Sequence, residues 1–395
     1  MIEKVKCPGF KTAGIAAGIK KNGVKDLGLI FSETSASVAG VFTKNRVKAA
    51  PVLLDMERVK SGTGRALVVN SGIANCCTGA AGMADAREMT KSVARALDVP
   101  EQAVFVSSTG VIGEPLPMGT IEAAIPELVD ALTGDDFSDL ANAIMTTDTF
   151  PKAVSRQGNI GGKIFTVAGV AKGSGMIRPD MATMLSFICT DAVVSSDTLN
   201  KTLFSAVGCS YNRLTIDGDT STNDTVLLMA NGVSGANIDD PEGKATFQKV
   251  LDEVAIALSR ALVKDGEGAT KLVEIRVRGA RTDSDARAVA DTIAHSNLVK
   301  TAFFGEDANW GRIIAAAGRS GVELDPERLD LFFDDIQMVN NSTGCGKGVE
   351  AQATRVMKKP EFVVTLDLNL AHGVASVLTC DFSVDYVKIN ADYRS

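Results

Sequence analysis

Strand and helix patterns come in mixed blocks along this sequence, and that order constrains the fold more than any other feature. In residues 271–279, KLVEIRVRG, apolar and charged residues alternate, which predicts a strand with one buried face. Residues 363–370, VVTLDLNL, repeat the alternation, and residues 65–72, RALVVNSG, are typical of a short strand buried on both faces. Because these strands do not alternate strictly with helices, we expect an α+β fold with a mostly antiparallel or mixed sheet.

Three other segments carry the 3.6-residue period of amphipathic helices. The longest, residues 245–264, has one apolar stripe and ends at the DGEG sequence of residues 265–268. A second stripe lies within residues 89–97 and ends before Pro100. A third helix is predicted over residues 284–297, with Ser284 as its N-cap. The stripe of the longest helix consists of Phe247, Val250, Leu251, Val254, Leu258 and Leu262.

The chain has 395 residues, so we expect two domains or one large unit with an extensive core. The clearest candidate boundary follows the strand at residues 271–279. We therefore predict a core domain over residues 1–280 and a smaller α+β subdomain over residues 281–395. The subdomain is expected to end in the extended segment of residues 375–395, ASVLTCDFSVDYVKINADYRS.

Composition excludes several classes of protein. The net charge of −7 comes without a basic stripe, so no nucleic-acid partner is expected. No apolar run approaches the roughly 18 residues of a membrane span, and the first residues lack the apolar core of a signal peptide. Seven cysteines, an odd number without Cys-x-x-Cys spacing, predict reduced thiols in a cytoplasmic protein and side chains that pack as small hydrophobic groups.

The two histidines restrict the chemistry further. His295 and His372 lie far apart in the sequence, and neither belongs to a paired-ligand spacing. We therefore expect no zinc site and no nucleophile that is activated by histidine. If the chain is an enzyme, its general base is expected to be another group.

The segment of residues 171–192, AKGSGMIRPDMATMLSFICTDA, supplies such a group. Threonine is a weak nucleophile without a base, but an N-terminal threonine has its own α-amine as that base. An α-amine ordinarily has a pKa of about 7.7–8.0, so part of it is neutral near pH 7. Thr183 reaches this state if its hydroxyl attacks the carbonyl of Ala182 and water hydrolyses the resulting ester. On local grounds alone, a threonine that simply begins a strand is the alternative.

This segment resembles the self-cleavage region of the ornithine acetyltransferases, also called bifunctional glutamate N-acetyltransferases, of arginine biosynthesis. Eight further segments are similar to that family in the same order and span nearly the whole chain. They are GVFTKNRVKAAPV, NSGIANCCTGAAG, SSTGVIGEPLP, IMTTDTFPK, TIDGDTSTNDT, VKDGEGATK, KTAFFGEDANWGRI and YVKINADYRS.

The resemblance implies a layered αββα core related to N-terminal-nucleophile enzymes. It also implies cleavage between Ala182 and Thr183 into an α-chain of residues 1–182 and a β-chain of residues 183–395. Thr183 then carries an acetyl group from N-acetylornithine to glutamate, with acetyl-CoA as a possible second donor. Two α-chains and two β-chains are expected to assemble, and no metal or cofactor is needed.

The same resemblance implies roles for individual residues. Thr109 and Gly110 match the oxyanion-hole pair of the family, with a hydroxyl and a backbone N–H as donors. Lys172 matches a substrate-contacting lysine, and an ammonium there suits a substrate carboxylate. The remaining substrate contacts that the family pattern implies are Thr147, Glu267, Asn390 and Ser395, with Thr146 as the alternative to Thr147.

The sequence assigns no catalytic role to two of these motifs. They are TIDGDTSTND at residues 215–224 and GEDANWGRI at residues 305–313, for which we expect structural turns and a packing role for Trp310. Two other functions stay open. One is a self-cleaving aminopeptidase or amidase, which would release free acetate. The other is a non-catalytic amino-acid-binding protein, which would keep the bond between Ala182 and Thr183 intact.

Overall fold

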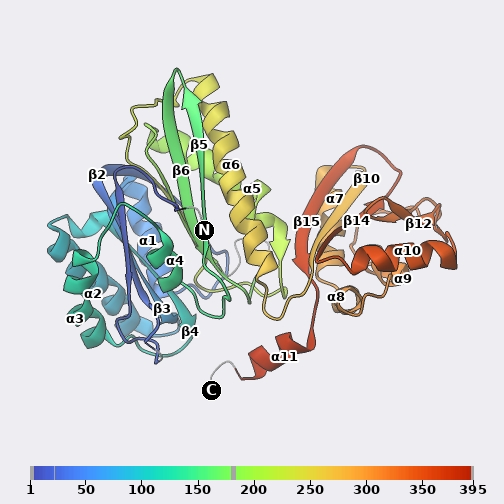
Figure 1. The fold of residues 1–395 in the computed structure, drawn as a ribbon, viewed down its shortest axis with the longest axis horizontal. Coiled ribbons are helices and arrows are strands. Elements are labelled where there is room, and N and C mark those ends of the chain that lie inside the picture. Colours follow the sequence, from blue (N-terminus) through green and yellow to red (C-terminus); the bar gives the residue numbers. More distant parts are fainter. Residues whose placement is uncertain (1–3, 22, 179–183, 393–395) are drawn as a thin grey trace. The chain divides into compact units, whose positions relative to one another are not determined.

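The computed structural model describes residues 4–21, 23–178 and 184–392 (Figure 1). The chain forms two units, one of residues 1–212 and 219–262 and one of residues 213–218 and 263–395. The boundary predicted from the sequence lies later, after residue 280. That position follows the strand β10 (Leu272–Ala280), which pairs on both sides within the second unit, so β10 belongs to that unit.

The first unit contains one mixed sheet of eight described strands. Its order is β4-β3-β2-β9-β7-β6-β5, with β1 paired to β2. The pairs β3–β4 and β7–β9 are parallel and the others are antiparallel, which confirms the expected mixed sheet. The strands are β1 (Phe10–Ile15), β2 (Leu27–Phe42), β3 (Thr63–Ile73), β4 (Val104–Val111), β5 (Lys152–Ile160), β6 (Lys163–Lys172), β7 (Leu185–Thr190) and β9 (Thr225–Ala230).

The long strand β2 divides this sheet into two layers. Its first part pairs with β1 and β3, its register shifts between Phe31 and Ala36, and its last part pairs with β9. One buried cluster contains Leu67 of the first layer together with Val170 and Phe187 of the second. The two halves therefore share an inner core, as two sheets of a sandwich do.

Helices cover the outer face of each layer (Figure 1). Met89 and Ile121, from α2 and α3, pack with Val106 on one side. On the other side the ring centroid of Phe247 in α6 lies 5.8 Å from that of Phe165 in β6. This arrangement confirms the αββα core. The helices are α1 (Ala50–Arg58), α2 (Gly79–Leu97), α3 (Met118–Asp130), α4 (Ser138–Ala143), α5 (Ser196–Cys209) and α6 (Pro241–Lys264), with short 3-10 turns η1 (Val59–Ser61), η2 (Glu101–Ala103) and η3 (Tyr211–Arg213).

The predicted helices are present, with one correction at an N-cap. α6 and α2 contain the two apolar stripes, and α7 (Asp283–Ala294) corresponds to the third. The N-cap of α7 is Thr282, whose side chain accepts a hydrogen bond from the backbone N–H of Asp285 at 3.1 Å, so the assignment of Ser284 was wrong. No helix in the described part of the chain is long and apolar enough to cross a membrane.

The second unit is a smaller α+β structure around one mixed sheet, ordered β13-β12-β11-β14-β10-β15-β8 among the described strands. Val273, Ile275 and Val277 of β10 are fully buried, which confirms the predicted alternation. Its other strands are β8 (Leu214–Thr215), β11 (Asp330–Phe333), β12 (Ile336–Asn340), β13 (Thr343–Gly344), β14 (Glu361–Asp367) and β15 (Gly373–Cys380). Its helices after α7 are α8 (Asn297–Phe304), α9 (Trp310–Gly318), α10 (Lys347–Met357) and α11 (Val384–Ala391).

Within the segment expected to be extended, residues 375–380 belong to β15, whereas residues 384–391 form the helix α11, contrary to the expectation. Ser383 caps α11 by accepting hydrogen bonds from the backbone N–H groups of Asp385 and Tyr386. The GEDANWGRI motif also contains a helix cap, since the side chain of Asn309 accepts from Arg312 N at the start of α9. Trp310 packs against the core of this unit, as expected.

The cysteines differ in burial. Four of them are buried, as the packing interpretation requires, and Cys209 is half-buried. Cys77 and Cys345 are exposed, so that interpretation was wrong for these two. Both lie outside the helices and strands.

Candidate active site

The two residues predicted for the oxyanion hole lie near the end of strand β4, just before its last residue, Val111. Thr109 is 6% exposed, and Gly110 has a φ of +131°, a backbone conformation that favours glycine. Gly110 pairs with Gly72 of β3, and a Cβ on Gly110 would lie 2.2 Å from the backbone carbon of Gly72. The close approach of the two strands therefore requires glycine at this position.

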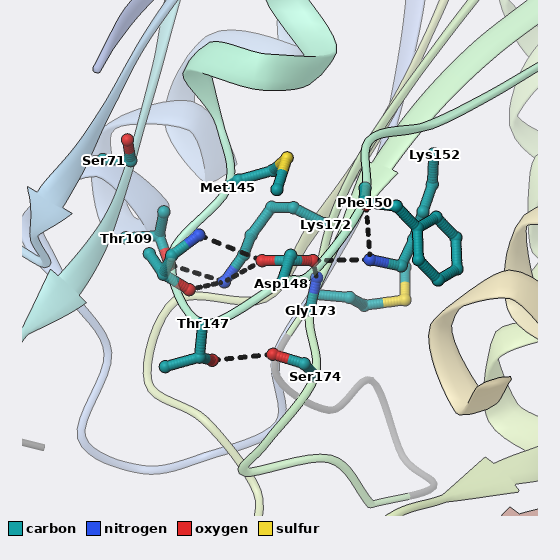
Figure 2. A network of polar contacts seen from close by, with 12 residues as sticks. Ser71, Thr109, Met145, Thr147, Asp148, Phe150, Lys152, Lys172, Gly173 and Ser174 are labelled. Atoms are coloured by element: carbon teal, nitrogen blue, oxygen red, sulfur yellow. Dashed lines mark hydrogen bonds and ion pairs between the residues drawn. The ribbon is translucent and has the colours of Figure 1, made fainter. Parts of the chain in front are cut away.

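Lys172, the last residue of β6, reaches this strand end. Its Nζ donates to Oγ1 of Thr109 at 3.3 Å and to Oγ1 of Thr146 at 2.7 Å (Figure 2). An ammonium has only donors, so in both contacts the hydroxyl oxygen is the acceptor. The hydroxyl hydrogen of Thr109 is consequently directed elsewhere, as a donor to a developing oxyanion must be.

Asp148 supplies the negative charge beside Lys172. Its Oδ1 accepts from Lys152 Nζ and from the backbone N–H of Gly173, both at 2.7 Å. Its Oδ2 accepts from the backbone N–H of Thr146 at 3.0 Å and lies 3.9 Å from Lys172 Nζ (Figure 2). One carboxylate thus lies between two lysines, and the side chains of Asp148 and Lys152 are both fully buried.

The charge state of Asp148 follows from these neighbours. Burial by itself would raise the pKa of its carboxyl. The charges of Lys172 and Lys152, with the hydrogen bonds from Lys152 and the Thr146 backbone, outweigh burial and lower the pKa to about 2. Asp148 is therefore ionised at neutral pH, and its carboxylate lies between the side chains of Lys152 and Lys172.

The two adjacent threonines have different partners. Thr146 contacts Lys172, whereas the hydroxyl of Thr147 shares a hydrogen bond of 2.6 Å with Ser174 (Figure 2). Lys172 therefore contacts both Thr109 and Thr146, whereas Thr147, the next residue of the same loop, contacts Ser174 instead. Sequence reasoning left the choice between the two threonines open.

Ala182 and Thr183 lie outside the described residues, but the strand that follows them is described. In the sheet, Leu185 of β7 lies opposite Lys172 of β6 on one side and Thr225 of β9 on the other. Leu185 follows Thr183 by two residues. Lys172, the cation predicted to contact the substrate, is therefore paired with the first residue of the strand that directly follows the nucleophile segment in the sequence.

Two of the residues predicted to contact the substrate, Glu267 and Asn390, lie in the second unit and form a hydrogen bond with each other. Nδ2 of Asn390 in α11 donates to Oε2 of Glu267 at 2.8 Å. Glu267 is 8% exposed and lies between α6 and β10. Ser395, the last predicted contact, lies outside the described residues. Within the described residues no group of three or more His, Cys, Asp or Glu side chains could hold a metal ion.

Sequence reasoning missed Asp148, Lys152 and Ser174. Asp148 and Lys152 were quoted within IMTTDTFPK as a mark of resemblance and received no role. Their spacing of four residues is a weak signal, because ion pairs at this spacing are common on exposed helices. Their importance comes from burial and from Lys172, which is 24 residues away from Asp148 in the sequence and is brought close by the β5–β6 hairpin.

Comparisons with known proteins find one family along nearly the whole chain. A model of the ArgJ family matches residues 11–395. The arginine biosynthesis bifunctional protein ArgJ of Geobacter sulfurreducens is 55% identical over 389 residues, which are 98% of this chain and 99% of that protein. The protein of the same name from Syntrophotalea carbinolica is 52% identical over 394 residues, 99% of this chain and all of that protein. The crystal structure of arginine biosynthesis bifunctional protein argJ from Bacillus halodurans has a TM-score of 0.51 at 40% identity, and covers 53% of this chain and 99% of that chain.

Proposed function

The chain belongs to the ArgJ family of arginine biosynthesis, and from this membership we propose that Thr183 carries an acetyl group from N-acetylornithine to glutamate. The chain is thus a glutamate N-acetyltransferase, and its products are ornithine and N-acetylglutamate. In this proposal cleavage between Ala182 and Thr183 comes first, because it releases the α-amine that serves as general base.

Each half of the reaction is an acyl transfer. In the first, Thr183 Oγ1 attacks the acetyl carbonyl carbon of N-acetylornithine and its proton passes to the α-amine. The carbon–nitrogen bond then breaks, the proton moves to the leaving nitrogen, and acetyl-Thr183 remains. In the second, the neutral amine of glutamate attacks this ester, the carbon–oxygen bond breaks, and Thr183 recovers its proton.

Both halves pass through a tetrahedral oxyanion, for which we assign Thr109 and Gly110 as donors. The single observation that carries the proposal is the bond from Lys172 Nζ to Thr109 Oγ1, at 3.3 Å. It joins a hydroxyl donor and a substrate-binding cation at the strand end next to β7. The ammonium suits the α-carboxylate of either substrate, and its charge also favours the neutral form of a nearby amine.

The length of a solved relative supports cleavage. Residues 183–395 make up just over half of this chain. The Bacillus halodurans chain is matched over 99% of its length and covers 53% of this chain. A solved chain of that size is what a protein cut near its middle provides.

Further properties follow from the same family pattern. We include acetyl-CoA as a second acetyl donor, since the relatives are named bifunctional. The substrates are small molecules, and we propose an assembly of two α-chains and two β-chains in the cytoplasm. Acetyl transfer measured with each donor in turn tests whether acetyl-CoA is used. The mass of the native particle tests the assembly of two α-chains and two β-chains.

Replacing Thr109 with valine tests the oxyanion hole. Valine keeps the shape of threonine and removes the hydroxyl donor, so kcat is expected to fall about 100- to 1,000-fold. The KM for N-acetylornithine should change less than about threefold, because the donor acts mainly on the transition state. Thr109→Ser, which keeps the hydroxyl, serves as the control and should retain most of the rate. Equal losses in the two variants would exclude the hydroxyl as the donor.

Glu267 is proposed to pair with the side-chain ammonium of ornithine. Glu267→Gln keeps the size of the side chain and its contact with Asn390 but removes the charge. A hydrogen bond to a charged group contributes about 1.5–3 kcal/mol, so the KM for N-acetylornithine should rise roughly 10- to 100-fold. The KM for glutamate, which has no such ammonium, should rise much less. Kinetics with each substrate varied in turn measure both values, and an equal rise in both would contradict this assignment.

A further inference from the structure

The motif of residues 215–224 has no part in the proposed reaction. Its last two residues nevertheless contact the residue before the oxyanion pair and the residue after the nucleophile. Nδ2 of Asn223 donates to the backbone carbonyls of Ala74 at 2.7 Å and Ser108 at 2.8 Å. Ser108 directly precedes Thr109. Asn223 therefore holds the end of β4 at the residue before the oxyanion pair.

Asp224 makes the corresponding contact on the nucleophile side. Its Oδ1 accepts from the backbone N–H of Met184 at 2.9 Å. Met184 is joined to Thr183 by one peptide bond, so the position of its nitrogen limits where Thr183 can lie. A second hydrogen bond holds the same residue, because the backbone N–H of Thr225 donates to the carbonyl of Met184 at 3.1 Å. Met184 is thus held through both its N–H and its carbonyl group.

The segment that carries these two side chains is itself fixed along its length. The carbonyl of Thr222 accepts from Ala49 N, and the carbonyls of Ser221 and Asp224 accept from the hydroxyl and the backbone N–H of Thr43. The hydroxyl of Thr222 also donates to Oδ1 of Asn223 at 2.6 Å, which orients the amide. Because this segment is fixed, the side chains of Asn223 and Asp224 are fixed too, and so are the backbone groups of Ser108 and Met184 that they bind.

We propose that Asn223 and Asp224 are positioning residues that set the separation between the nucleophile Thr183 and the oxyanion pair Thr109–Gly110. This inference rests on the proposed function. Reacting groups must lie within a few tenths of an ångström of their productive geometry, and a displacement of about 1 Å can cost on the order of 100-fold in rate. Asn223 and Asp224 touch neither the acetyl group nor the amino acid in this proposal, and they act only through Ser108 and Met184.

The environment of Asp224 agrees with this role. The side chain is 1% exposed, and Oδ2 has no hydrogen-bond partner among the residues that the structure describes. Burial raises the pKa of its carboxyl, against the hydrogen bond from Met184 and the charge of Lys172. Asparagine has nearly the same shape as aspartate and keeps a side-chain carbonyl oxygen, so it should replace Asp224 and still accept from Met184 N.

The test compares this pair with the same kinds of contact at the opposite ends of the same strands. Asn223→Ala and Asp224→Ala remove the two contacts, and Asp224→Asn keeps the acceptor. At the far end of β9, Asn231 Nδ2 donates to the carbonyl of Pro8 at 2.9 Å, and Asn231→Ala is the first control. At the far end of β7, buried Asp191 accepts from Thr166 N at 2.7 Å, and Asp191→Ala is the second control.

For each variant, the intact mass gives the cleaved fraction, thermal unfolding gives stability, and acetyl transfer per cleaved molecule gives kcat and KM. We expect Asn223→Ala and Asp224→Ala to slow cleavage and to lower kcat about 10- to 100-fold, with KM changed less than about threefold. Asp224→Asn and both controls should keep kcat within about threefold of the wild type, even where the controls lose as much stability. Should Asp224→Ala fail to fold, Asn223→Asp supplies a variant of equal volume that lacks the amide donor.

Two results would overturn the inference. One is a loss of kcat in Asn223→Ala and Asp224→Ala no larger than in the controls, which would leave these contacts a purely structural role. The other is an equal loss in Asp224→Asn and Asp224→Ala, which would assign the effect to the acid itself. A wild-type chain without acetyl transfer in the same assay would contradict the proposed function, whereas an active wild type leaves the inference to be judged on its own.

Discussion

Thr183→Ala is expected to leave one intact chain of 395 residues and to abolish acetyl transfer, while the wild type yields fragments of residues 1–182 and 183–395. The physical reason is that one hydroxyl serves both steps. It attacks the carbonyl of Ala182 during cleavage, and the acetyl carbonyl during transfer, and alanine has no nucleophile for either. Intact mass under denaturing conditions measures the first effect, and formation of N-acetylglutamate measures the second.

Two controls separate chemistry from folding. Thr183→Ser keeps a hydroxyl and should still cleave, although more slowly or less completely. Thr190→Ala removes a buried threonine hydroxyl at the other end of β7, where Oγ1 accepts from Ala192 N at 3.2 Å, and should cleave normally. Cleavage of Thr183→Ala at the same bond, or a wild type that transfers acetyl without being cut, would exclude Thr183 as the N-terminal nucleophile.

Asp148→Asn is expected to destabilise the protein by about 2 to 5 kcal/mol. The lower figure follows from the pKa of about 2, which lies nearly two units below the ordinary value of 3.8. The higher figure is typical when a buried charge loses its partner, and here the buried ammonium groups of Lys152 and Lys172 lose theirs. Because Lys172 also contacts Thr109, kcat/KM should fall at least tenfold. Chemical denaturation and acetyl-transfer kinetics measure the two effects.

The matched control is an ion pair with the same spacing and length on the surface. Asp197 and Lys201 are four residues apart and 2.7 Å from each other, as Asp148 and Lys152 are, but their side chains are 78% and 75% exposed. Asp197→Asn should therefore cost less than about 1 kcal/mol. Equal costs at the two sites would mean that burial does not strengthen the inner pair.

The same carboxyl gives the wild type a dependence on pH that the variant lacks. The pKa of Asp148 is lowered on folding, so its contribution is fully present above the unfolded pKa near 3.8 and is lost as the pH falls toward 2. The free energy of unfolding of the wild type should therefore fall by about 2 kcal/mol more than that of Asp148→Asn over this range. Parallel curves for the two proteins would contradict the assignment.

Predictions from periodicity succeeded where one face of an element is buried. β10 and α6 each bury a regular set of apolar side chains, so their patterns are visible in the sequence. α11 has no buried residue, and a helix without a buried face has no apolar period to read. At the start of α7 two cap-forming residues lie close together, and only the path of the backbone selects Thr282 over Ser284.

The sequence by itself determined the α+β class, the family, and the candidate nucleophile, because these depend on local periods and on motifs that are contiguous in the chain. Only the tertiary structure decided which side chains support the site. Lys172 meets Thr109 across 63 positions, Asn223 meets Ser108 across 115, and Asp224 meets Met184 across 40. These pairings follow from the order and register of strands in one sheet, and Asp148 is ionised because two lysines beside it outweigh the effect of its burial. Neither the register nor the burial is encoded in any single stretch of residues.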